Sequence, residues 1–118
     1  MTQLSRHFKR AEFACKCGCG FDTVDTGTLE VLEQVRLEFL SPVTITSGCR
    51  CNTYNRQVGG ATNSQHRLGR AADIQVEDVP PEEVQKWLAL NFPNLSIGEY
   101  STFTHIDTRT NGPARWRG

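Results

Sequence analysis

Apolar residues recur at helical spacing between residues 26 and 40. They follow one another at steps of three or four: Leu29, Leu32, Val35 and Phe39. This spacing predicts an amphipathic helix that buries one stripe of its surface. Asp25 or Thr26 is the expected N-cap, and Pro42 ends the element because the residue before a proline avoids helical geometry.

A second helix is predicted from Pro80-Pro81 to about Leu90, since proline suits the first turn of a helix. The side chains expected on its core side are Val84, Trp87 and Leu88. A shorter helix is expected over residues 50–58, and a helical turn is expected near residues 5–13.

Four other segments have the β-branched or alternating pattern that is typical of strands. They span residues 43–46, 71–76, 97–100 and 103–108. Helices and strands in this order predict an α+β fold, in which a small, mainly antiparallel sheet packs on two or three helices.

The length of 118 residues predicts a single domain that spans residues 1–118, with residues 1–24 as an irregular, cysteine-containing arm. Thirteen basic side chains balance thirteen acidic ones, which argues against a basic face for nucleic acid. No run of about eighteen apolar residues occurs, so no membrane span is predicted. We expect a monomer.

Five cysteines occur in two groups, CKCGCG and CRC. An odd number without a secretory signal argues against a pure disulfide framework. One interpretation is reduced thiols that pack as small apolar residues. The other is a structural metal held by four of the five, with Gly18 and Gly20 allowing the chain to fold around it. The candidate ligands are Cys15, Cys17, Cys19, Cys49 and Cys51.

The segment SQHRLGRAAD combines a histidine, a glycine and an aspartate. Gly69 would allow the chain to turn so that His66 swings back toward Asp73. Ala71 is expected on the same strand face as Asp73 and leaves room beside its carboxylate. Taken alone, the segment fits a metal site, and it equally fits an ordinary aspartate beside a surface histidine.

The segment FTHIDTR alternates along a predicted strand, so His105 and Asp107 share one face while Ile106 anchors the other. A histidine satisfied within the core is the alternative to a ligand. With His66 and Asp73, however, His105 completes a set of three protein ligands with a fourth position open, as in catalytic zinc sites. Two imidazoles and one carboxylate leave such a site with a charge of about +1, which favours ionisation of bound water.

Longer segments around these residues resemble the zinc D-alanyl-D-alanine carboxypeptidase family. The segments are ITSGCRCNTYN, VGGATNSQHRLGRAADI and IGEYSTFTHIDTR. The family also includes vancomycin-resistance dipeptidases, phage L-alanyl-D-glutamate endolysins and, by fold, the hedgehog signalling domain. Its S-x-H-x-x-G-x-A-x-D pattern is matched in full from Ser64 to Asp73, and HFKRAEFACKCGCGF is similar to the lead segment of small single-domain phage members.

The resemblance implies that His66, Asp73 and His105 bind Zn²⁺. It also implies that Arg50 holds a substrate carboxylate or the carbonyl under attack, for which a guanidinium is suited. Ser64 is expected to hydrogen-bond substrate or to orient its loop. The alternatives are a solvated Arg50 and a simple turn at Ser64.

The general base is where the sequence departs from many family members, which carry an acid three residues before the last histidine. Thr102 occupies that position. An acid six residues before the histidine, as in hedgehog-like members, is matched by Glu99, and strand alternation would put it on the face of His105. We expect Glu99 to be the base, with Asp107 as the alternative or as an acceptor that orients a metal-bound histidine.

The expected activity is zinc-dependent hydrolysis of peptide bonds in peptidoglycan stem peptides, of the D-alanyl-D-alanine carboxypeptidase or the L-alanyl-D-glutamate endopeptidase type. The alternative is a non-catalytic, zinc-containing binding module or phage structural module. An iron(II) oxygenase fits less well, because its second histidine normally follows H-x-D and no histidine follows Asp107. Because the first residues lack the apolar stretch of a secretory signal, we expect a protein that is cytoplasmic when made and acts on the bacterial cell wall after release.

Overall fold

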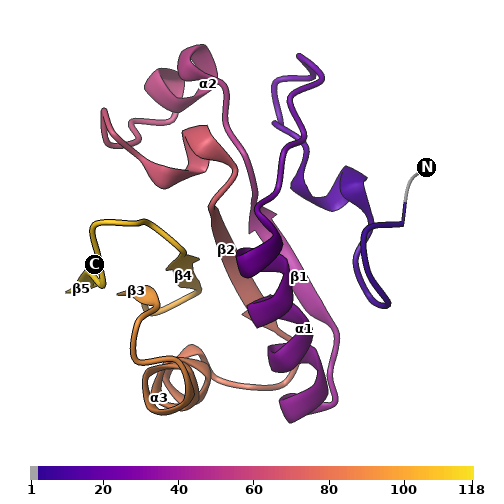
Figure 1. Cartoon of the computed structure of the whole chain (residues 1–118), viewed down its shortest axis with the longest axis vertical. Coiled ribbons are helices and arrows are strands. Elements are labelled where there is room, and N and C mark those ends of the chain that lie inside the picture. The colour runs from indigo at the N-terminus through magenta and orange to yellow at the C-terminus, as the bar shows by residue number, and fades with distance from the viewer. Residues whose placement is uncertain (1–2) are drawn as a thin grey trace.

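The computed structural model of the chain describes residues 3–118 and contains one five-stranded sheet (Figure 1). The strands are β1 (Val43–Ser47), β2 (Ala71–Val76), β3 (Ser96–Glu99), β4 (Thr104–Asp107) and β5 (Arg115–Arg117). Their order is β1-β2-β4-β3-β5, and all neighbours are antiparallel except β3 and β5. The predicted α+β fold with a mainly antiparallel sheet is confirmed.

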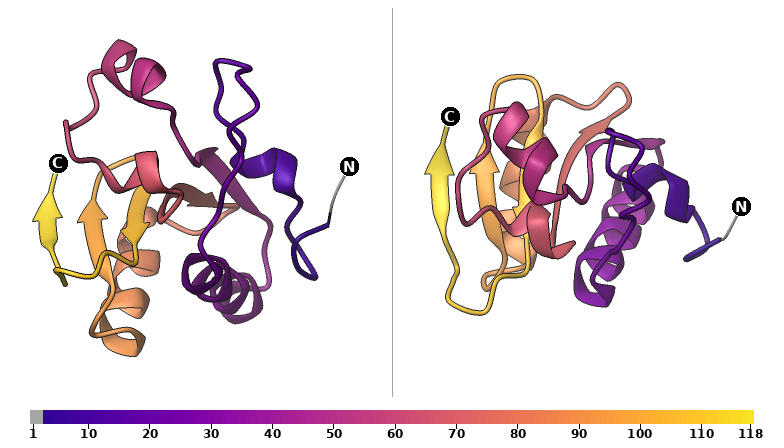
Figure 2. Two further views of the ribbon diagram at one scale, coloured as in Figure 1. Left: turned by 45° about the horizontal axis from the view of Figure 1, so that its top comes forward. Right: turned by 90° about the horizontal axis from the view of Figure 1, so that it is seen from above.

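Three α-helices and two short 3-10 helices accompany the sheet within residues 3–118. They are η1 (Arg10–Phe13), α1 (Thr26–Phe39), α2 (Asn52–Gln57), η2 (Gln65–Leu68) and α3 (Pro81–Asn91). The two long helices α1 and α3 lie on one side of the sheet, whereas α2 and η2 lie on the other (Figure 2, left). One face of the sheet is therefore covered by long helices, and the opposite face is left to short elements and loops.

The long elements lie within one residue of their predicted bounds. The helix expected over residues 50–58 is shorter than predicted and comprises only α2. The helical turn expected near residues 5–13 is likewise shorter and comprises only η1. The sequence pattern predicts neither β5 nor η2, because each is too short to show a period.

Asp25 begins α1 as one of the two expected N-caps. Its carboxylate accepts the backbone N–H groups of Gly27 and Thr28 at 3.1 and 3.4 Å. These contacts satisfy donors that have no partner within the helix. At the other end, Leu40 adopts a left-handed backbone with a φ of 53° and ends the helix before Pro42.

The central strands have an apolar face and a polar face. On β2, Ala72 and Ile74 belong to the hydrophobic core, whereas Asp73 between them lies on the other face. On β4, Ile106 pairs with Ala72 and joins the core, while His105 pairs with Asp73. The helices and β3 complete this core with the buried side chains of Leu32, Val35, Val84, Leu88 and Ile97.

The N-terminal arm packs against the segment that follows β1. Phe8 and Phe13 are buried, with ring centroids 6.1 Å apart. The Phe13 carbonyl accepts the N–H of Cys49 at 2.9 Å. Gly48 is required beside it, because an added Cβ would lie 2.5 Å from that carbonyl oxygen. The arm is irregular in its backbone but fixed in place.

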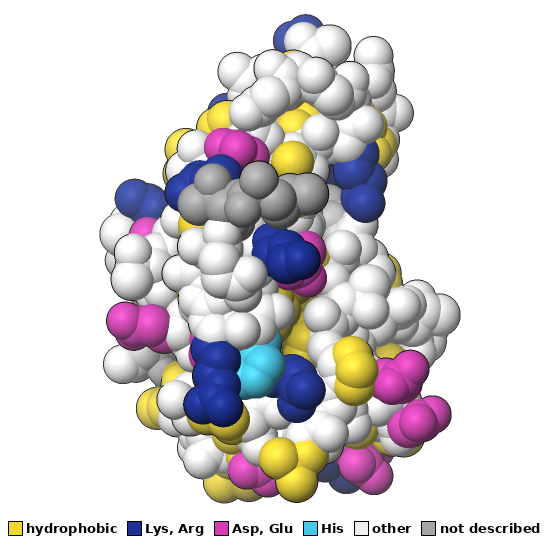
Figure 3. All heavy atoms as spheres, turned by 90° about the vertical axis from the view of Figure 1, so that its right-hand side faces the viewer, with side chains coloured by type: hydrophobic (Ala, Val, Ile, Leu, Met, Phe, Trp, Pro, Cys, Tyr) yellow, Lys and Arg dark blue, Asp and Glu magenta, His cyan; other side chains and the backbone are white. Residues whose placement is uncertain are grey.

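Charged side chains of both signs are interspersed on the face that Figure 3 shows, in keeping with the zero formal net charge. The longest helix, α1, has 14 residues and is polar along one side. Between residues 3 and 118, no helix is long and apolar enough to cross a membrane.

Glu33 joins α1 to the N-terminal arm. Its carboxylate accepts the Ser5 hydroxyl, the backbone N–H of His7 at 2.8 Å and the Nδ1 group of His7 at 2.6 Å. Partial burial opposes ionisation of the carboxyl group, but these hydrogen bonds outweigh it and lower the pKa of Glu33. A charged acceptor therefore holds the start of the arm on the helix.

We expect Glu33→Gln to lower the free energy of unfolding by about 1.5–3 kcal/mol, the range for hydrogen bonds to charged groups. Because the folded-state pKa is lowered, this contribution is present above the unfolded value of about 4.3 and is lost as pH falls through the folded value. Denaturant unfolding at neutral and acidic pH measures the difference. Glu30→Gln, on the exposed side of α1, is the control and should change stability by less than about 0.5 kcal/mol. Equal losses in the two variants would contradict the role of Glu33.

Candidate metal centre

Two neighbouring strands and a 3-10 helix bring the three predicted metal ligands together. Asp73 on β2 lies directly opposite His105 on β4, so the two side chains leave the same face of the sheet. His66 belongs to η2, which packs against β2. One ligand atom of each residue lies within 4.8 Å of the other two, and all three residues are buried.

The carbonyl of Gly48 fixes the tautomer of His66. A carbonyl oxygen only accepts, so Nδ1 of His66, 2.6 Å away, carries the proton and donates it. In the neutral ring, Nε2 is then an unprotonated nitrogen, and it lies 3.3 Å from Oδ1 of Asp73. Two acceptor atoms that face each other at this distance are stabilised by a cation between them.

His105 lies between two carboxylates. Its Nδ1 is 2.8 Å from Oδ1 of Asp73, and its Nε2 is 2.7 Å from Oδ2 of Asp107. Burial opposes protonation of the ring, but the two carboxylates outweigh it and raise the pKa of His105. Asp107 holds the Nε2–H group, which leaves Nδ1 as the ligand atom on the side of Asp73 and His66.

The carboxylate of Asp73 is buried but ionised. Desolvation opposes its charge, but the hydrogen bond with His105 outweighs it and holds the pKa of Asp73 well below its usual range. Nη2 of Arg50 lies 3.6 Å from Oδ2. One carboxylate oxygen thus faces the two histidines, and the other faces a guanidinium.

Asp107 is fully buried, and both of its carboxylate oxygens have hydrogen-bond partners. Arg109 donates from Nε to Oδ1 at 2.8 Å and from Nη2 to Oδ2 at 2.7 Å, as a bidentate ion pair. Desolvation opposes its charge, but Arg109 and His105 outweigh it and hold the pKa of Asp107 well below its usual range. A carboxylate so stabilised is a poor base, and its geometry suits an acceptor that orients His105.

The predicted position of Glu99 on the same sheet face as His105 is wrong. The segment is not one strand, because β3 ends at Glu99, the chain turns, and β4 begins at Thr104. In the antiparallel register Gly98 lies opposite His105, whereas Glu99 lies opposite Thr104, which contacts α3. The partly exposed Glu99 side chain pairs with Arg117 at 3.4 Å. Glu99 therefore faces away from the metal centre.

Arg50 and Ser64, the predicted substrate-binding residues, flank the three ligands. Arg50 donates from Nε to Oγ of Ser47 at 3.1 Å and from Nη1 to Oδ1 of Asn55 at 3.2 Å, so its guanidinium is fixed. The Ser64 hydroxyl accepts the N–H of His66 at 3.2 Å and caps η2. Ser64 thus orients the loop that carries His66.

A hollow of about 490 Å³ adjoins the three ligands. Arg50, Arg109 and three aromatic rings belong to its lining, and the rings are those of Tyr100, Phe103 and Trp116. Tyr100 stacks on Phe103 with centroids 4.3 Å apart, and its hydroxyl accepts Nε1–H of Trp116 at 2.9 Å. The sequence pattern does not predict this aromatic wall, because its members come from a turn and from the unpredicted β5.

Trp116 reaches the centre across a glycine. Gly98 on β3 pairs with His105 on one side and with Trp116 on the other. A Cβ at Gly98 would lie 2.6 Å from the indole, so only glycine lets the ring cross the strand. The indole then lies 5.0 Å from the ring of His105. β5 therefore completes the wall of the hollow although it carries no ligand.

The donor set suits zinc. Two imidazole nitrogens and one carboxylate oxygen form the kind of three-residue set found in catalytic zinc sites, where a fourth position is open to water or substrate. The hollow beside the ligands leaves room for that position. Gly48 and Asp107 orient the two histidines from behind, as the outer partners of metal ligands do.

Four of the five candidate cysteines form a second group on another part of the structure. The Sγ atoms of this group lie within 4.8 Å of one another: Cys15, Cys17, Cys19 and Cys51. Cys49 lies outside the group, where its buried thiol donates to the carbonyls of Phe13 and Phe21 at 3.1 and 3.0 Å. The structure therefore distinguishes the one cysteine that the sequence could not separate from the others.

Comparisons with known proteins point to one peptidase family. The family model described as Peptidase M15 matches residues 6–107, a range that includes all three candidate ligands. The chain is 32% identical over 102 residues to the Peptidoglycan L,D-endopeptidase MepK of Escherichia coli strain K12, and equally to the proteins of that name from Escherichia coli O157:H7 and Shigella flexneri. The match covers 79% of this chain and 54% of each relative, so the chain spans about half the length of these curated relatives.

We expect His66→Ala and His105→Ala each to remove one equivalent of bound zinc while the domain stays folded, since each deletes one of three ligands. Elemental analysis of protein purified without chelator measures the metal, and circular dichroism checks the fold. His7→Ala removes the remaining histidine of the chain and should keep the full zinc content. Unchanged zinc in both ligand variants would contradict this centre.

Proposed function

Because the chain belongs to the peptidase M15 family, we propose that it hydrolyses peptide bonds in peptidoglycan stem peptides with one Zn²⁺ held by His66, Asp73 and His105. The observation that carries this proposal is the convergence of three ligand atoms, within 4.8 Å of one another, beside a hollow lined by two guanidinium groups and three aromatic rings. The relatives named peptidoglycan L,D-endopeptidase support the substrate class.

The residues around the metal prepare the chemistry. When bound, zinc polarises a peptide carbonyl and lowers the pKa of a coordinated water. Gly48 and Asp107 hold the protonated ring nitrogens of His66 and His105, so that the opposite nitrogens present lone pairs to the metal. Arg109 pairs with Asp107 and offsets the cost of burying that carboxylate behind His105.

Arg50 is suited to bind negative charge on the substrate. Ser47 and Asn55 hold its guanidinium, and its Nη2 group lies beside the carboxylate of Asp73 at the hollow. A guanidinium fixed in this way can bind a stem-peptide carboxylate, or the oxyanion that develops on the carbonyl under attack. Because the group is already ordered, little reorganisation opposes that stabilisation.

The lining of the hollow suits short peptides that are rich in carboxylates. Arg50 and Arg109 supply positive charge, and the aromatic wall supplies flat apolar surface for the peptide chain. Following the L,D-endopeptidase relatives, we infer that the bond cut joins an L-residue to a D-residue, as in the L-alanyl-D-glutamate link. Removal of a terminal D-alanine is the alternative specificity.

A non-catalytic zinc-binding module is the second candidate function. One observation favours it: among residues 3–118, the only carboxylate that lines the hollow is that of Asp73, a candidate metal ligand. Glu99 faces away and Asp107 is occupied on both oxygens. Hydrolysis would therefore rely on zinc and Arg50 without a separate carboxylate base.

We expect Asp107→Asn to lower turnover and zinc affinity by about 10–100-fold, the usual effect of losing the outer partner of a metal-bound histidine. Glu99→Gln, on the opposite face of the sheet, should leave both quantities close to the wild-type values. Rate measurements and zinc titration against a competing chelator test the pair. An inactive, zinc-loaded Glu99→Gln protein beside an active Asp107→Asn protein would restore Glu99 as the base.

Incubation with purified peptidoglycan should release new amine groups and peptide fragments, which mass spectrometry identifies. A zinc chelator should stop the reaction, and added Zn²⁺ should restore it. Release of free D-alanine alone would assign the carboxypeptidase specificity. If zinc-loaded protein released no amine from peptidoglycan of several chemotypes, the binding module would replace the peptidase as the function.

Arg50→Ala should lower kcat/KM by about 10²–10³-fold, the range for removing one preorganised partner of an oxyanion. Zinc content should stay unchanged, because Arg50 is not a ligand. Arg50→Lys is the matched control: it keeps the charge but loses the planar fork, and should lie between wild type and alanine. Activity of Arg50→Ala equal to wild type would remove Arg50 from the substrate site.

A further inference from the structure

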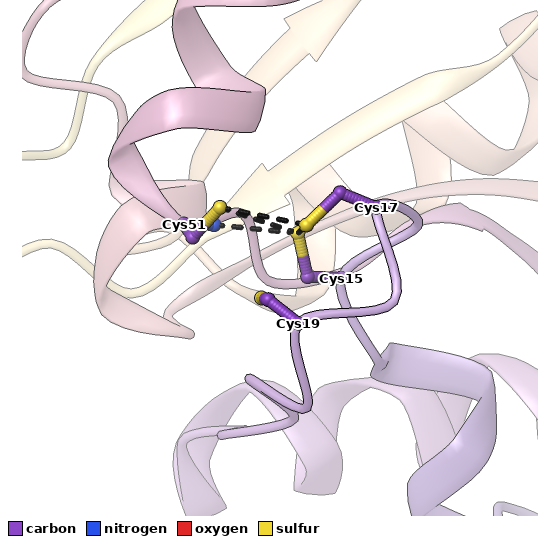
Figure 4. Close-up of side chains that lie close together, drawn as sticks. All are labelled: Cys15, Cys17, Cys19 and Cys51. Atoms are coloured by element: carbon purple, nitrogen blue, oxygen red, sulfur yellow. Dashed lines mark hydrogen bonds between the residues drawn. The ribbon is translucent and has the colours of Figure 1, made fainter.

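Three cysteines of the N-terminal arm face one cysteine at the start of α2 (Figure 4). Cys15, Cys17 and Cys19 belong to a single loop, and Cys51 is the N-cap residue of α2. We call these four residues the sulfur cluster. None of them is among the residues that line the hollow at the metal centre.

The spacing within the sulfur cluster fits a metal and does not fit a disulfide. The Sγ–Sγ distances are 3.5 Å between Cys15 and Cys17, 3.7 Å between Cys17 and Cys51, and 3.8 Å between Cys15 and Cys51. A disulfide requires about 2.0 Å. Tetrahedral zinc with Zn–S bonds of about 2.3 Å separates its sulfurs by about 3.8 Å. We propose that the sulfur cluster binds a second, structural Zn²⁺ through four thiolates.

Two glycines give the loop the shape that such a site needs. Gly18 and Gly20 have φ values of 82° and 93°, in the left-handed region that favours glycine. An added Cβ at either position would have no heavy atom within 4 Å, so the backbone and not crowding selects glycine. The alternation of cysteine and glycine thereby turns the chain tightly enough to gather three thiols in five residues.

Backbone N–H groups already point at two of the sulfurs. The N–H of Cys51 donates to Sγ of Cys15, and the N–H of Tyr54 donates to Sγ of Cys51, both at 3.4 Å. Hydrogen bonds of this kind strengthen when the acceptor is ionised. They would stabilise thiolates and orient them, as the outer partners of metal ligands do.

Apolar packing contributes little to holding the loop in this conformation. Residues 16–20 are exposed, and they include two of the four thiols. Little burial is therefore available to offset the entropy cost of fixing these residues. A zinc ion that binds only the folded loop supplies folding free energy directly.

The sulfur cluster would also hold one side of the metal centre. Cys51 directly follows Arg50, whose backbone N–H donates to the carbonyl of His66 at 2.9 Å. A zinc at Cys51 thus links the N-terminal arm to the segment that positions Arg50 and His66. This consequence rests on the proposed function, whereas the second zinc itself does not.

The zinc content of the full chain, purified under reducing conditions without chelator, tests the proposal. We expect two equivalents in wild type, one in Cys17→Ser and in Cys19→Ser, one in His105→Ala, and none in the combined Cys19→Ser and His105→Ala protein. Cys49→Ser is the matched control, since a serine hydroxyl can donate to the same carbonyls as the thiol of Cys49. It should keep both equivalents.

Cobalt identifies the ligands even where a cysteine variant fails to fold. Exchange of Zn²⁺ for Co²⁺ in His105→Ala should produce the intense near-ultraviolet charge-transfer absorption that thiolate ligands cause. Absence of that absorption from a folded, cobalt-loaded protein would overturn the proposal. A thiol titration of wild-type protein that has been unfolded and freed of metal, without added reductant, should count five free thiols. A smaller count would identify a disulfide and would also overturn the proposal of a second zinc.

The zinc content of these variants distinguishes failure of the second zinc site from failure of the peptidase centre. A wild-type protein with one zinc that His105→Ala removes would leave the peptidase centre and overturn the second site. A protein with one zinc that Cys19→Ser removes and His105→Ala retains would support the sulfur cluster and contradict the first centre.

Discussion

The hydrogen bond from Nδ1 of His66 to the carbonyl of Gly48 joins η2 to the segment that follows β1. It fixes the imidazole in the tautomer that a metal requires. Gly48 is in turn pressed against the carbonyl of Phe13, where no larger residue fits, so the N-terminal arm determines where this acceptor lies. The residues that follow carry Arg50 to Asp73. The arm, the segment after β1 and the metal centre are therefore parts of one arrangement.

The elements that the sequence predicts well are those whose side chains repeat with a period. α1 and α3 bury a stripe, and the strands bury alternate residues, so a shift in their bounds would expose apolar surface. β5 could not be predicted, because its three residues are placed by backbone pairing with β3 and not by a pattern of their own. The same holds for η2, whose place depends on the cap at Ser64 and the left-handed Gly69.

The sequence likewise predicts some residues of the candidate site and misplaces others. His66, Asp73 and His105 could be proposed from spacing and family resemblance, and the structure brings them together. The role of Glu99 could not be predicted reliably, because a turn that interrupts an apparent strand reverses which face each later residue occupies. Nor could the sequence separate Cys49 from the other cysteines, since its acceptors are the carbonyls of Phe13 at the end of η1 and of Phe21 in a loop, and no sequence pattern places either of them beside Cys49.

The alternation along β2 and β4 also limits how the chain can change in length. Asp73 and Ile74 point to opposite faces, and their partners on β4 do the same. Insertion or deletion of one residue within either strand would move a carboxylate into the core and an isoleucine toward the candidate metal ligands, so the core and the ligand set would be disrupted together. The connection at residues 110–114 carries neither ligand nor core residue. Altered length there would move β5, and with it the ring of Trp116, while the three candidate ligands keep their places on η2, β2 and β4. The shape of the hollow can therefore change at this connection without the loss of a ligand.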